Sequence, residues 1–584
     1  MNQWNLDALY PSVDSEAFQH DFDDIDRQIA GLNKLADSLE QDSPASTLRK
    51  VILALSDYQT LTRKIGAYLS LRQSANTTDQ QIVSINSRFQ NKISQSARAT
   101  TRFSQWIARQ DIEALIGMDP LLSQHAFWLR ETQARAAHTL SDEVEEAIGK
   151  MELNASSAWS QLQEYMTSTV SVTLHGEPMT LSAIRNLAYS PEAQVRKDAY
   201  QAELKAYDQI KDAVAFALNS IKGEANTVSQ LRHFDSVLDM TLFNSRMKRE
   251  TLDAMMQAIE EALPKFHEYL RHKAKLLGYS NGLPFYELFA PMGKSSRTFT
   301  PQQAKDYLIR NFEPFSSEVS NLIQRTFDEE WIDFFPRKGK VGGAFCCNLP
   351  MLKQSRVLTN FDGSLSDVVT LAHELGHAYH GHRIEQHSPL NTRYTMPVAE
   401  TASTFNETVI MNAAIRDAAE KEEKVMLIES SLQDITQVIC DILSRFLFES
   451  EVVERRKEGF LFSQDLEQLM LQAQKKAYGD GLDPQALHPY MWVCKSHYYD
   501  AGLNFYNFPY AFGCLFAKGL YARYQKTGAA FVQQYDKLLE ATTVSSVEEV
   551  AAMAGIDLTK PDFWRESLNI VKDMIDEFIA LTSR

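Results

Sequence analysis

The chain has 584 residues, and its 59 lysines and arginines are outnumbered by 76 aspartates and glutamates, which gives a formal net charge of −17. This length predicts two or more substructures with a large buried core, and the acidic balance argues against binding to nucleic-acid phosphates. Five cysteines without a disulfide framework, and a chain without a signal segment or a membrane-spanning apolar run, predict a soluble protein of the reducing cytoplasm.

The first pattern along the chain is helical. Residues 14–167 are polar with regularly placed Leu, Ile and Ala, which is typical of amphipathic helices. An alternating segment followed by a Gly-containing turn then predicts a small hairpin near residues 168–180. The helical pattern resumes afterwards and continues through most of the chain. The predicted fold is therefore mainly α, with a helical N-terminal region at 1–190 and a larger region at 191–584 that carries the motifs described below.

Residues 339–347 are rich in glycine and end in two adjacent cysteines. Glycines let a backbone approach closely, and the exposed edge of a short strand can pair with an extended peptide. From the residues alone, the simpler prediction is a turn that leads into an interior strand of a small β-sheet. The pair Cys346-Cys347 is too close in sequence for an ordinary disulfide and lacks metal-ligand spacing.

A helix is predicted after the turn at residues 361–364. Ser364 and Asp367 have the spacing of a capping box, apolar residues follow at helical spacing, and Gly381 can end the helix. A helix of about seventeen residues fits between these signals. We expect the small β-sheet to lie beside it.

This predicted helix carries two histidines at the spacing of a zinc site. His373 and His377 are four residues apart, so they lie on one face of the helix and can bind the same ion. Glu374 follows the first histidine and can act as a base on water without binding the metal. The five-residue motif is that of a metalloprotease helix, and it predicts one Zn²⁺ per chain.

A catalytic zinc ion usually has three protein ligands, so one more ligand is required. The metzincin pattern would place a glycine and a histidine at the positions that His380 and Arg383 occupy, so this class is excluded. The remaining class has a glutamate as the third ligand. His380 and His382 are interpreted as packed or surface residues, because a histidine near a motif is more often one of these than a ligand.

Three glutamates are candidates for the third ligand: Glu385, Glu400 and Glu407. Glu385 follows the predicted end of the helix and would need a tight reversal to reach the ion. Glu400 lies in a second predicted helix at residues 396–407, which Pro397 can start. We predict that Glu400 binds the metal and that Glu407, two turns further on, orients a ligating histidine.

With these motifs in place, the chain resembles oligoendopeptidase F, in the family of zinc metallopeptidases that includes thimet oligopeptidase. The resemblance rests on residues 372–378, 400–407 and 497–510 and on the opening segment 4–7, so it covers nearly the whole chain. It implies a hollowed, mostly helical body that admits short unfolded peptides and excludes folded proteins. The implied activity is a zinc-dependent cleavage of internal peptide bonds.

The resemblance also implies roles in substrate binding. It places substrate-binding groups at His497 and Tyr506, and at Tyr510 if the pattern shifts by one residue, because Pro509 stands where the next tyrosine is expected. A hydroxyl or imidazole N–H aimed at the scissile carbonyl would stabilise the charge that develops on its oxygen. From the residues alone, a core or channel wall explains this aromatic run equally well.

The glycine-rich segment has an implied role as well. In the resembling family it lines the cleft, so Gly343, Ala344 and Phe345 are implied to hold the substrate backbone.

Two other functions of the protein stay open at this point. One is a zinc exopeptidase that releases residues or dipeptides from a terminus, and the other is a peptide-binding protein with a vestigial motif. The oligomeric state and the cleavage preference are not predicted.

Overall fold

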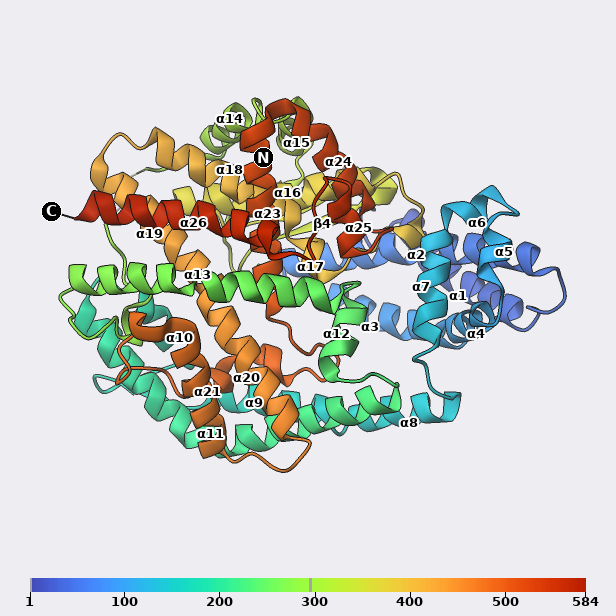
Figure 1. The fold of residues 1–584 in the computed structure, drawn as a ribbon. Coiled ribbons are helices and arrows are strands. Elements are labelled where there is room, and N and C mark those ends of the chain that lie inside the picture. Colours follow the sequence, from blue (N-terminus) through green and yellow to red (C-terminus); the bar gives the residue numbers. More distant parts are fainter. Residues whose placement is uncertain (1–2, 294–296, 584) are drawn as a thin grey trace.

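The computed structural model describes residues 3–293 and 297–583. The helices fall into three groups, and each group has its own cluster of buried hydrophobic side chains. In Figure 1 the N-terminal group lies at the right, the group around α11 lies below, and the largest group lies above and to the left. The described residues are mainly helical, as predicted.

The N-terminal group consists of α1 (Glu16–Ala36), α2 (Pro44–Ala75), α3 (Gln80–Ser94), α4 (Ala97–Ala108), α5 (Ile112–Ile116), α6 (Pro120–Gln124) and α7 (Ala126–Ala136). Helix α1 illustrates why these segments are helices. Ser15 accepts a hydrogen bond from the Phe18 N–H at its start. Phe18, Phe22, Ile25 and Ile29 then recur at helical spacing and are buried on one face.

The group around α11 consists of α8 (Asp142–Glu152), α9 (Ser156–Thr169), α10 (Leu181–Asn186), η1 (Leu187–Tyr189), α11 (Ala193–Leu231), α20 (Ile442–Arg455), α21 (Ser463–Tyr478), α22 (Met491–Cys494) and η7 (Ser496–Tyr499). Its hydrophobic cluster joins side chains from both sides of residue 190. The division at that residue stays a prediction about domain organisation.

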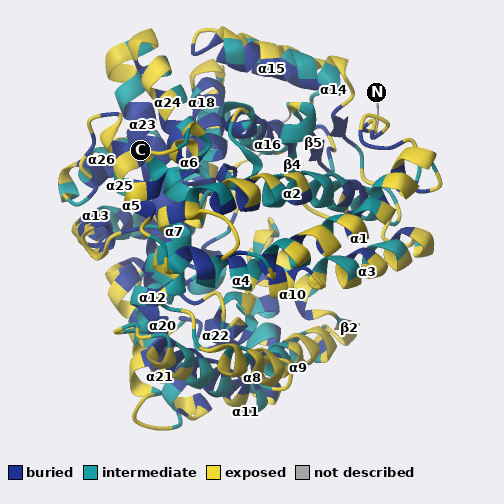
Figure 2. Cartoon of the chain, turned by 90° about the vertical axis from the view of Figure 1, so that its right-hand side faces the viewer, coloured by how far each residue is buried: buried dark blue, intermediate teal, exposed yellow. Residues whose placement is uncertain are grey.

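The largest group consists of α12 (Val237–Asn244), α13 (Arg249–Leu276), α14 (Pro301–Phe312), α15 (Ser317–Asp328), α16 (Leu365–Ile384), α17 (Met396–Ala399), α18 (Thr401–Asp417), α19 (Lys421–Thr436), α23 (Phe508–Thr527), α24 (Val532–Ala541), α25 (Val547–Ala552) and α26 (Pro561–Thr582). A π-helical segment, η5 (Gln437–Asp441), connects α19 to α20. Figure 2 shows that outer helices such as α1, α3 and α8 have exposed faces. Helix α23 is buried along most of its length.

Two small sheets complete the fold, as predicted. Strands β1 (Val172–Leu174) and β2 (Glu177–Met179) form an antiparallel hairpin in the expected segment. Its two-residue turn places His175 and Gly176 at positive φ, the geometry of the tight turns that match the twist of two paired strands.

Within the described residues, no helix combines the length and apolar character needed to cross a membrane.

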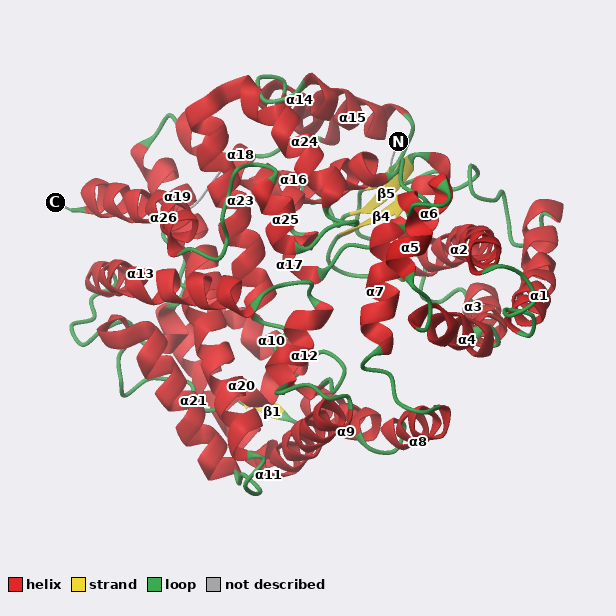
Figure 3. Ribbon diagram, turned by 45° about the vertical axis from the view of Figure 1, so that its right-hand side comes forward, coloured by secondary structure: helices red, strands yellow, loops and turns green. Residues whose placement is uncertain are grey.

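The second sheet has the strand order β3-β5-β4. Strand β3 (Ile332–Asp333) runs parallel to β5 (Gln354–Leu358), and β4 (Phe345–Leu349) pairs with β5 antiparallel. Strand β4 is therefore an outer strand, and the interior strand predicted from the residues alone is wrong. Strand β4 contacts α16, next to which β4 and β5 are visible in Figure 3. The predicted sheet beside the histidine-bearing helix is present.

Candidate metal centre

Helix α16 carries the two histidines and begins as predicted. The Ser364 side chain accepts a hydrogen bond from the Asp367 N–H, and the Asp367 carboxylate accepts one from the Ser364 N–H. The predicted end at Gly381 is wrong, because the helix continues to Ile384. Gly381 instead makes room for the side chain of Asn348 on β4, which would collide with a Cβ atom at this position. Asn348 in turn donates a hydrogen bond to the His377 carbonyl, at 3.2 Å.

Glu400 lies at a junction between two helices. The single helix predicted at residues 396–407 is interrupted, because α17 ends at Ala399 and α18 begins at Thr401. Glu400 has φ −91° and ψ 8°, outside regular helical geometry. The Ser403 hydroxyl donates a 2.6 Å hydrogen bond to Glu400 Oε2 and so restricts the orientation of this carboxylate.

Three side-chain atoms from α16 and this junction converge on one point. His373 Nε2 and His377 Nε2 are 3.2 Å apart, and each lies 3.3 Å from Glu400 Oε2. Ligands at about 2.0–2.1 Å from a tetrahedral zinc ion are separated from one another by roughly 3.3 Å. Two imidazoles and one carboxylate are also a common ligand set for catalytic zinc. The donor atoms and their spacing therefore fit a tetrahedral divalent metal ion.

The surroundings of His373 favour a positive charge at this point. Its Nδ1 lies 2.8 Å from Glu407 Oε1, so Nδ1 carries the proton of the neutral ring and Nε2 is left to bind a metal. Burial alone would lower the pKa of His373, but the contacts with Glu400 and Glu407 raise it to about 10. The same histidine contacts hold the pKa of Glu400 well below its usual range, although burial opposes them.

Glu374 is buried beside the metal ligands, with 5% of its surface exposed. Burial raises the pKa of this carboxyl above its ordinary value, and the positive field of the two histidines opposes the rise. A buried carboxylate with a raised pKa binds a proton more readily than an exposed one, as a general base requires. Its position one residue after His373 matches the predicted role.

Two glycines allow the elements of the site to pack closely, and the sequence analysis missed both. A Cβ atom at Gly376 would lie 2.5 Å from the Ala402 carbonyl oxygen, so this glycine lets α16 and α18 touch. A Cβ at Gly513 on α23 would lie 3.1 Å from that of Glu400. Their occurrence inside helical patterns is a signal that could have predicted close packing.

The structure brings His497, Tyr506 and Tyr510 together. The ring centroids of His497 and Tyr506 are 4.8 Å apart, and those of Tyr506 and Tyr510 are 5.4 Å apart. Burial and the hydrogen bond with Tyr506 raise the pKa of Tyr510 well above its usual range, so its hydroxyl stays protonated at neutral pH. Burial and the charges of Arg445 and Lys495 lower the pKa of His497. These rings can therefore donate hydrogen bonds as neutral groups.

A buried ion-pair network, which the sequence analysis also missed, supports the segment that carries Tyr506. Glu449 Oε1 accepts hydrogen bonds from Lys222 Nζ at 2.7 Å and from the Phe505 N–H at 3.0 Å. Glu449 Oε2 accepts another from Asn507 Nδ2 at 2.8 Å. Phe505 has a φ of 54°, a conformation that is unusual for a residue with a side chain. We will call these four residues the Glu449 network.

The glycine-rich segment lies at the start of the outer strand β4. Gly343 has a φ of 76°, and its carbonyl accepts a hydrogen bond from Asn360 Nδ2 at 2.8 Å. The Phe345 ring packs into the N-terminal hydrophobic cluster, 6.2 Å from the ring of Trp4. Any contact of Gly343, Ala344 and Phe345 with a substrate would therefore come from the backbone of this segment.

His380 is a packed residue, in agreement with the interpretation from sequence. It is buried, its ring stacks on Tyr394 at 4.4 Å, and its Nε2 lies 2.8 Å from the Thr542 hydroxyl. Burial lowers its pKa to about 3.

Of the other candidate ligands, Glu385 contacts His382 at 3.2 Å rather than the converging ligand atoms. Of the three candidate glutamates, only Glu400 belongs to the group of ligand atoms found in the described part of the chain.

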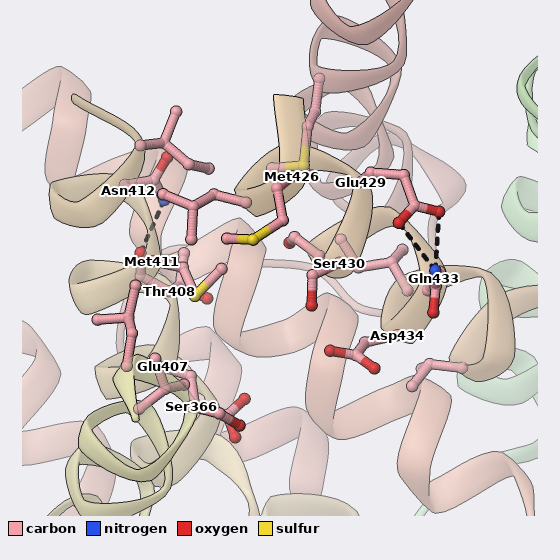
Figure 4. Close-up of a pocket in the computed structure, with 18 of the residues that line it drawn as sticks. Ser366, Glu407, Thr408, Met411, Asn412, Met426, Glu429, Ser430, Gln433 and Asp434 are labelled. Carbon is pink, nitrogen blue, oxygen red and sulfur yellow. Dashed lines mark hydrogen bonds between the residues drawn. The ribbon is translucent and has the colours of Figure 1, made fainter. Parts of the chain in front are cut away.

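A cavity of about 870 Å³ adjoins these residues. His373, Glu400, Glu407 and Tyr510 line it near the converging ligands. The cavity extends between α18, α19 and α23, and Figure 4 shows the part that lies between α18 and α19. The ligand atoms can therefore be reached by a molecule in this cavity.

A helical body with two imidazoles, one carboxylate and an adjacent buried glutamate defines the class of candidate metal-dependent hydrolases. Comparison with known proteins then gives the family. The model of peptidase family M3 matches residues 186–570, and the oligopeptidase F model matches residues 107–171. The chain belongs to peptidase family M3, and the resemblance inferred from the motifs is confirmed.

Individual relatives agree with this assignment. The chain is 24% identical to oligopeptidase PepF of Bacillus subtilis, with 99% of this chain and 87% of that one covered. Its fold is similar to that of oligoendopeptidase-F from Enterococcus faecium, with a TM-score of 0.72 at 20% identity and with 97% and 99% of the two chains covered. A solved structure from Chlamydophila abortus gives a TM-score of 0.83 at 19% identity, covering 99% and 98%.

Proposed function

We propose that this peptidase is a zinc-dependent endopeptidase that hydrolyses internal bonds of short unfolded oligopeptides, with one zinc ion per chain. The observation that carries the proposal is the convergence of His373, His377 and Glu400 at the mutual distances of tetrahedral zinc ligands. Membership of peptidase family M3 supports the reaction class. The names of the relatives, oligopeptidase and oligoendopeptidase, support short peptides as substrates.

Each residue of the site has a role in this proposal. When bound, zinc supplies Lewis acidity that polarises the scissile carbonyl and lowers the pKa of water. Glu374 takes a proton from the attacking water and passes it to the leaving amine. Glu407 holds the proton of His373 on Nδ1, so that the ligating nitrogen stays free.

The aromatic groups and the outer strand bind the substrate. His497, Tyr506 and Tyr510 donate hydrogen bonds to the carbonyl oxygen as negative charge develops on it. The backbone from Gly343 to Phe345 leads into the outer strand β4 and pairs with the extended peptide through groups other than the Gly343 carbonyl, which is bonded to Asn360. The proposed compartment is the reducing cytoplasm, on the basis of five cysteines that form no disulfide framework.

Mass spectrometry of a mixed peptide library tests the activity. The protein is incubated with zinc, with a chelator, and with zinc restored after chelation. We expect internal cleavage in the first and third samples and none in the second. Peptides with both termini blocked separate endopeptidase from exopeptidase activity, since an exopeptidase would leave them intact. Activity that persists without metal would contradict the proposal.

Metal analysis of two matched variants tests the third ligand. Glu400→Ala is expected to lose zinc and activity, because only two ligands remain. Glu385→Ala removes a glutamate that contacts a histidine outside the ligand group, and it is expected to keep both. Stoichiometric zinc in Glu400→Ala would reject Glu400 as a ligand.

A further inference from the structure

The cavity contains a polar end that the proposed mechanism does not use. On α19, Met426, Ser430 and Asp434 follow one another at intervals of four residues, and all three line the cavity. Each interval is about 6 Å along a helix. Figure 4 shows these side chains facing Met411 and Thr408 of α18 across the cavity. The two helices thus form a slot with methionines at one end and a carboxylate at the other.

The Asp434 side chain has no hydrogen-bond or ion-pair partner among residues 3–293 and 297–583. Its carboxylate is accessible from the cavity, and no hydrogen bond or ion pair joins it to another described residue. Asp434 is exposed to the cavity, and partial desolvation by the cavity walls, together with the charges of Glu407 and Glu429, raises its pKa to about 6. No described group pairs with the ionised carboxylate, so a positive charge placed beside it would gain a favourable interaction.

Glu429 lies one turn before Gln433 on the same helix. Unlike the carboxylate of Asp434, that of Glu429 is paired within the protein. Its carboxylate accepts hydrogen bonds from Lys273 Nζ, from the Tyr269 hydroxyl at 2.9 Å and from Gln433 Nε2 at 2.8 Å. It is 2% exposed, and its charge is neutralised internally. Asp434, by contrast, has a negative charge that an incoming group can neutralise.

Lys518 is the internal cation whose charge acts on Asp434. It lies on α23, lines the same cavity and is 7% exposed. Its charge lowers the pKa of Asp434, but this effect is smaller than the opposing effects of burial, Glu407 and Glu429. No ion pair joins Lys518 to Asp434 in the part of the chain described. The region around Asp434 therefore still favours an additional cation.

The rest of the slot fits a long basic side chain. Methionine side chains adapt to flexible apolar groups, and the stems of lysine and arginine are apolar while their ends are charged. Met411 and Met426 can pack against such a stem. The Ser430 hydroxyl can accept a hydrogen bond from the charged end beside Asp434.

We propose that Asp434 is a specificity-determining residue that receives a cationic group of the peptide, namely the side chain of a lysine or arginine close to the scissile bond. The cavity is shared with His373 and Glu400, and the charge of Glu407, which contacts His373, acts on Asp434, so a peptide bound at the candidate metal centre can extend to this residue. The inference rests on the proposed peptidase function and adds a substrate preference to it.

Paired substrates test this preference. Two N-acetylated peptides are compared, one with lysine at the position of interest and one with its neutral isostere norleucine, and the position is scanned on both sides of the cleaved bond. The wild type is expected to favour the lysine peptide in kcat/KM at one position. Asp434→Asn should reduce the lysine-to-norleucine ratio roughly tenfold or more and leave the norleucine value nearly unchanged.

Three further variants sharpen the test. Asp434→Glu keeps the charge and should retain much of the preference. Lys518→Met removes a competing cation and should increase it. Glu422→Gln removes a charge from the exposed first turn of the same helix, away from the cavity, and should leave the ratio unchanged. Repeating the comparison with a free N-terminus separates a side-chain cation from a terminal ammonium as the preferred source.

The outcomes distinguish this inference from the function on which it rests. An unchanged ratio in Asp434→Asn, or an equal loss for both peptides, would overturn the specificity role. Hydrolysis of the norleucine peptide with zinc tests the peptidase function separately. If no peptide is hydrolysed, calorimetric binding of the same pair to the wild type and Asp434→Asn still decides whether Asp434 receives a cation.

Discussion

Two groups of charged side chains in this protein join distant parts of the chain in opposite ways. In the Glu449 network, Lys222 and Glu449 are 0% and 1% exposed, and each acceptor oxygen has a donor. In the candidate metal centre, His373, His377 and Glu400 are 25%, 17% and 30% exposed, and their ligand atoms converge on one point. The first group is saturated and supports structure, whereas the second can still bind a cation. The two groups differ in how their nitrogen and oxygen atoms are placed rather than in charge: those of the Glu449 network are paired with one another, whereas those of the candidate metal centre converge.

The largest expected effect separates chemistry from structure within the metal centre. In the proposed mechanism Glu374→Gln removes the proton acceptor but no metal ligand, so activity should fall roughly 10²- to 10⁴-fold while zinc content and stability stay nearly unchanged. Peptide turnover, metal analysis and urea unfolding measure the three quantities. A fully active variant would show that another group acts as the base.

Breaking the Glu449 network should lower the stability of the protein as well as its activity. Glu449→Ala leaves Lys222 buried without its counter-charge, so the free energy of unfolding should fall by about 3–5 kcal/mol. Zinc should stay bound, and turnover should drop because the segment from Phe505 to Asn507 loses its anchor. Urea unfolding and metal analysis test this prediction. Glu451→Ala on the same helix is the control, since its ion pair with Arg455 is exposed.

A smaller effect is expected from the contact between α16 and α18. Gly376→Ala adds a methyl group against the Ala402 backbone, so the helices must separate. We expect a loss of about 1–3 kcal/mol in stability and weaker zinc binding, because Glu400 moves with α18. Urea unfolding with and without zinc measures the stability and the strength of zinc binding. Wild-type zinc affinity in this variant would mean that the site does not depend on the close contact.

The smallest effect is expected at Glu407. Glu407→Gln keeps a hydrogen-bond acceptor beside His373 but removes the charge, so metal affinity or activity should fall roughly 10- to 100-fold. Competition with a chelating dye measures the affinity. Equal metal affinities in the variant and the wild type would show that Glu407 lines the cavity without orienting His373 for metal binding.

Much of this arrangement follows from the sequence. The spacing of His373 and His377 requires only a helix, and the capping box at Ser364 and Asp367 predicts where that helix begins. The hairpin near residue 175 and the small sheet beside α16 are also present. These features depend on neighbours close in sequence, for which propensity and periodicity are informative.

Other features depend on contacts between distant segments. The end of α16 could not be predicted from Gly381, since the reason for that glycine is the side chain of Asn348 on β4. The interruption at Glu400 and the links from Glu449 to Phe505 and Asn507 likewise arise from tertiary packing. A local pattern carries no information about such partners.

The helix junction at Glu400 has a consequence for behaviour in acid. Glu400 occupies the position immediately before the first turn of α18. The partial positive charge at a helix N-terminus stabilises a carboxylate there, and this effect adds to that of the histidines. Glu400 therefore remains ionised at a pH at which an exposed glutamate is protonated. As the solution is acidified, protons should displace the metal by binding to the imidazoles, and the carboxylate should be the last of the three ligands to take up a proton.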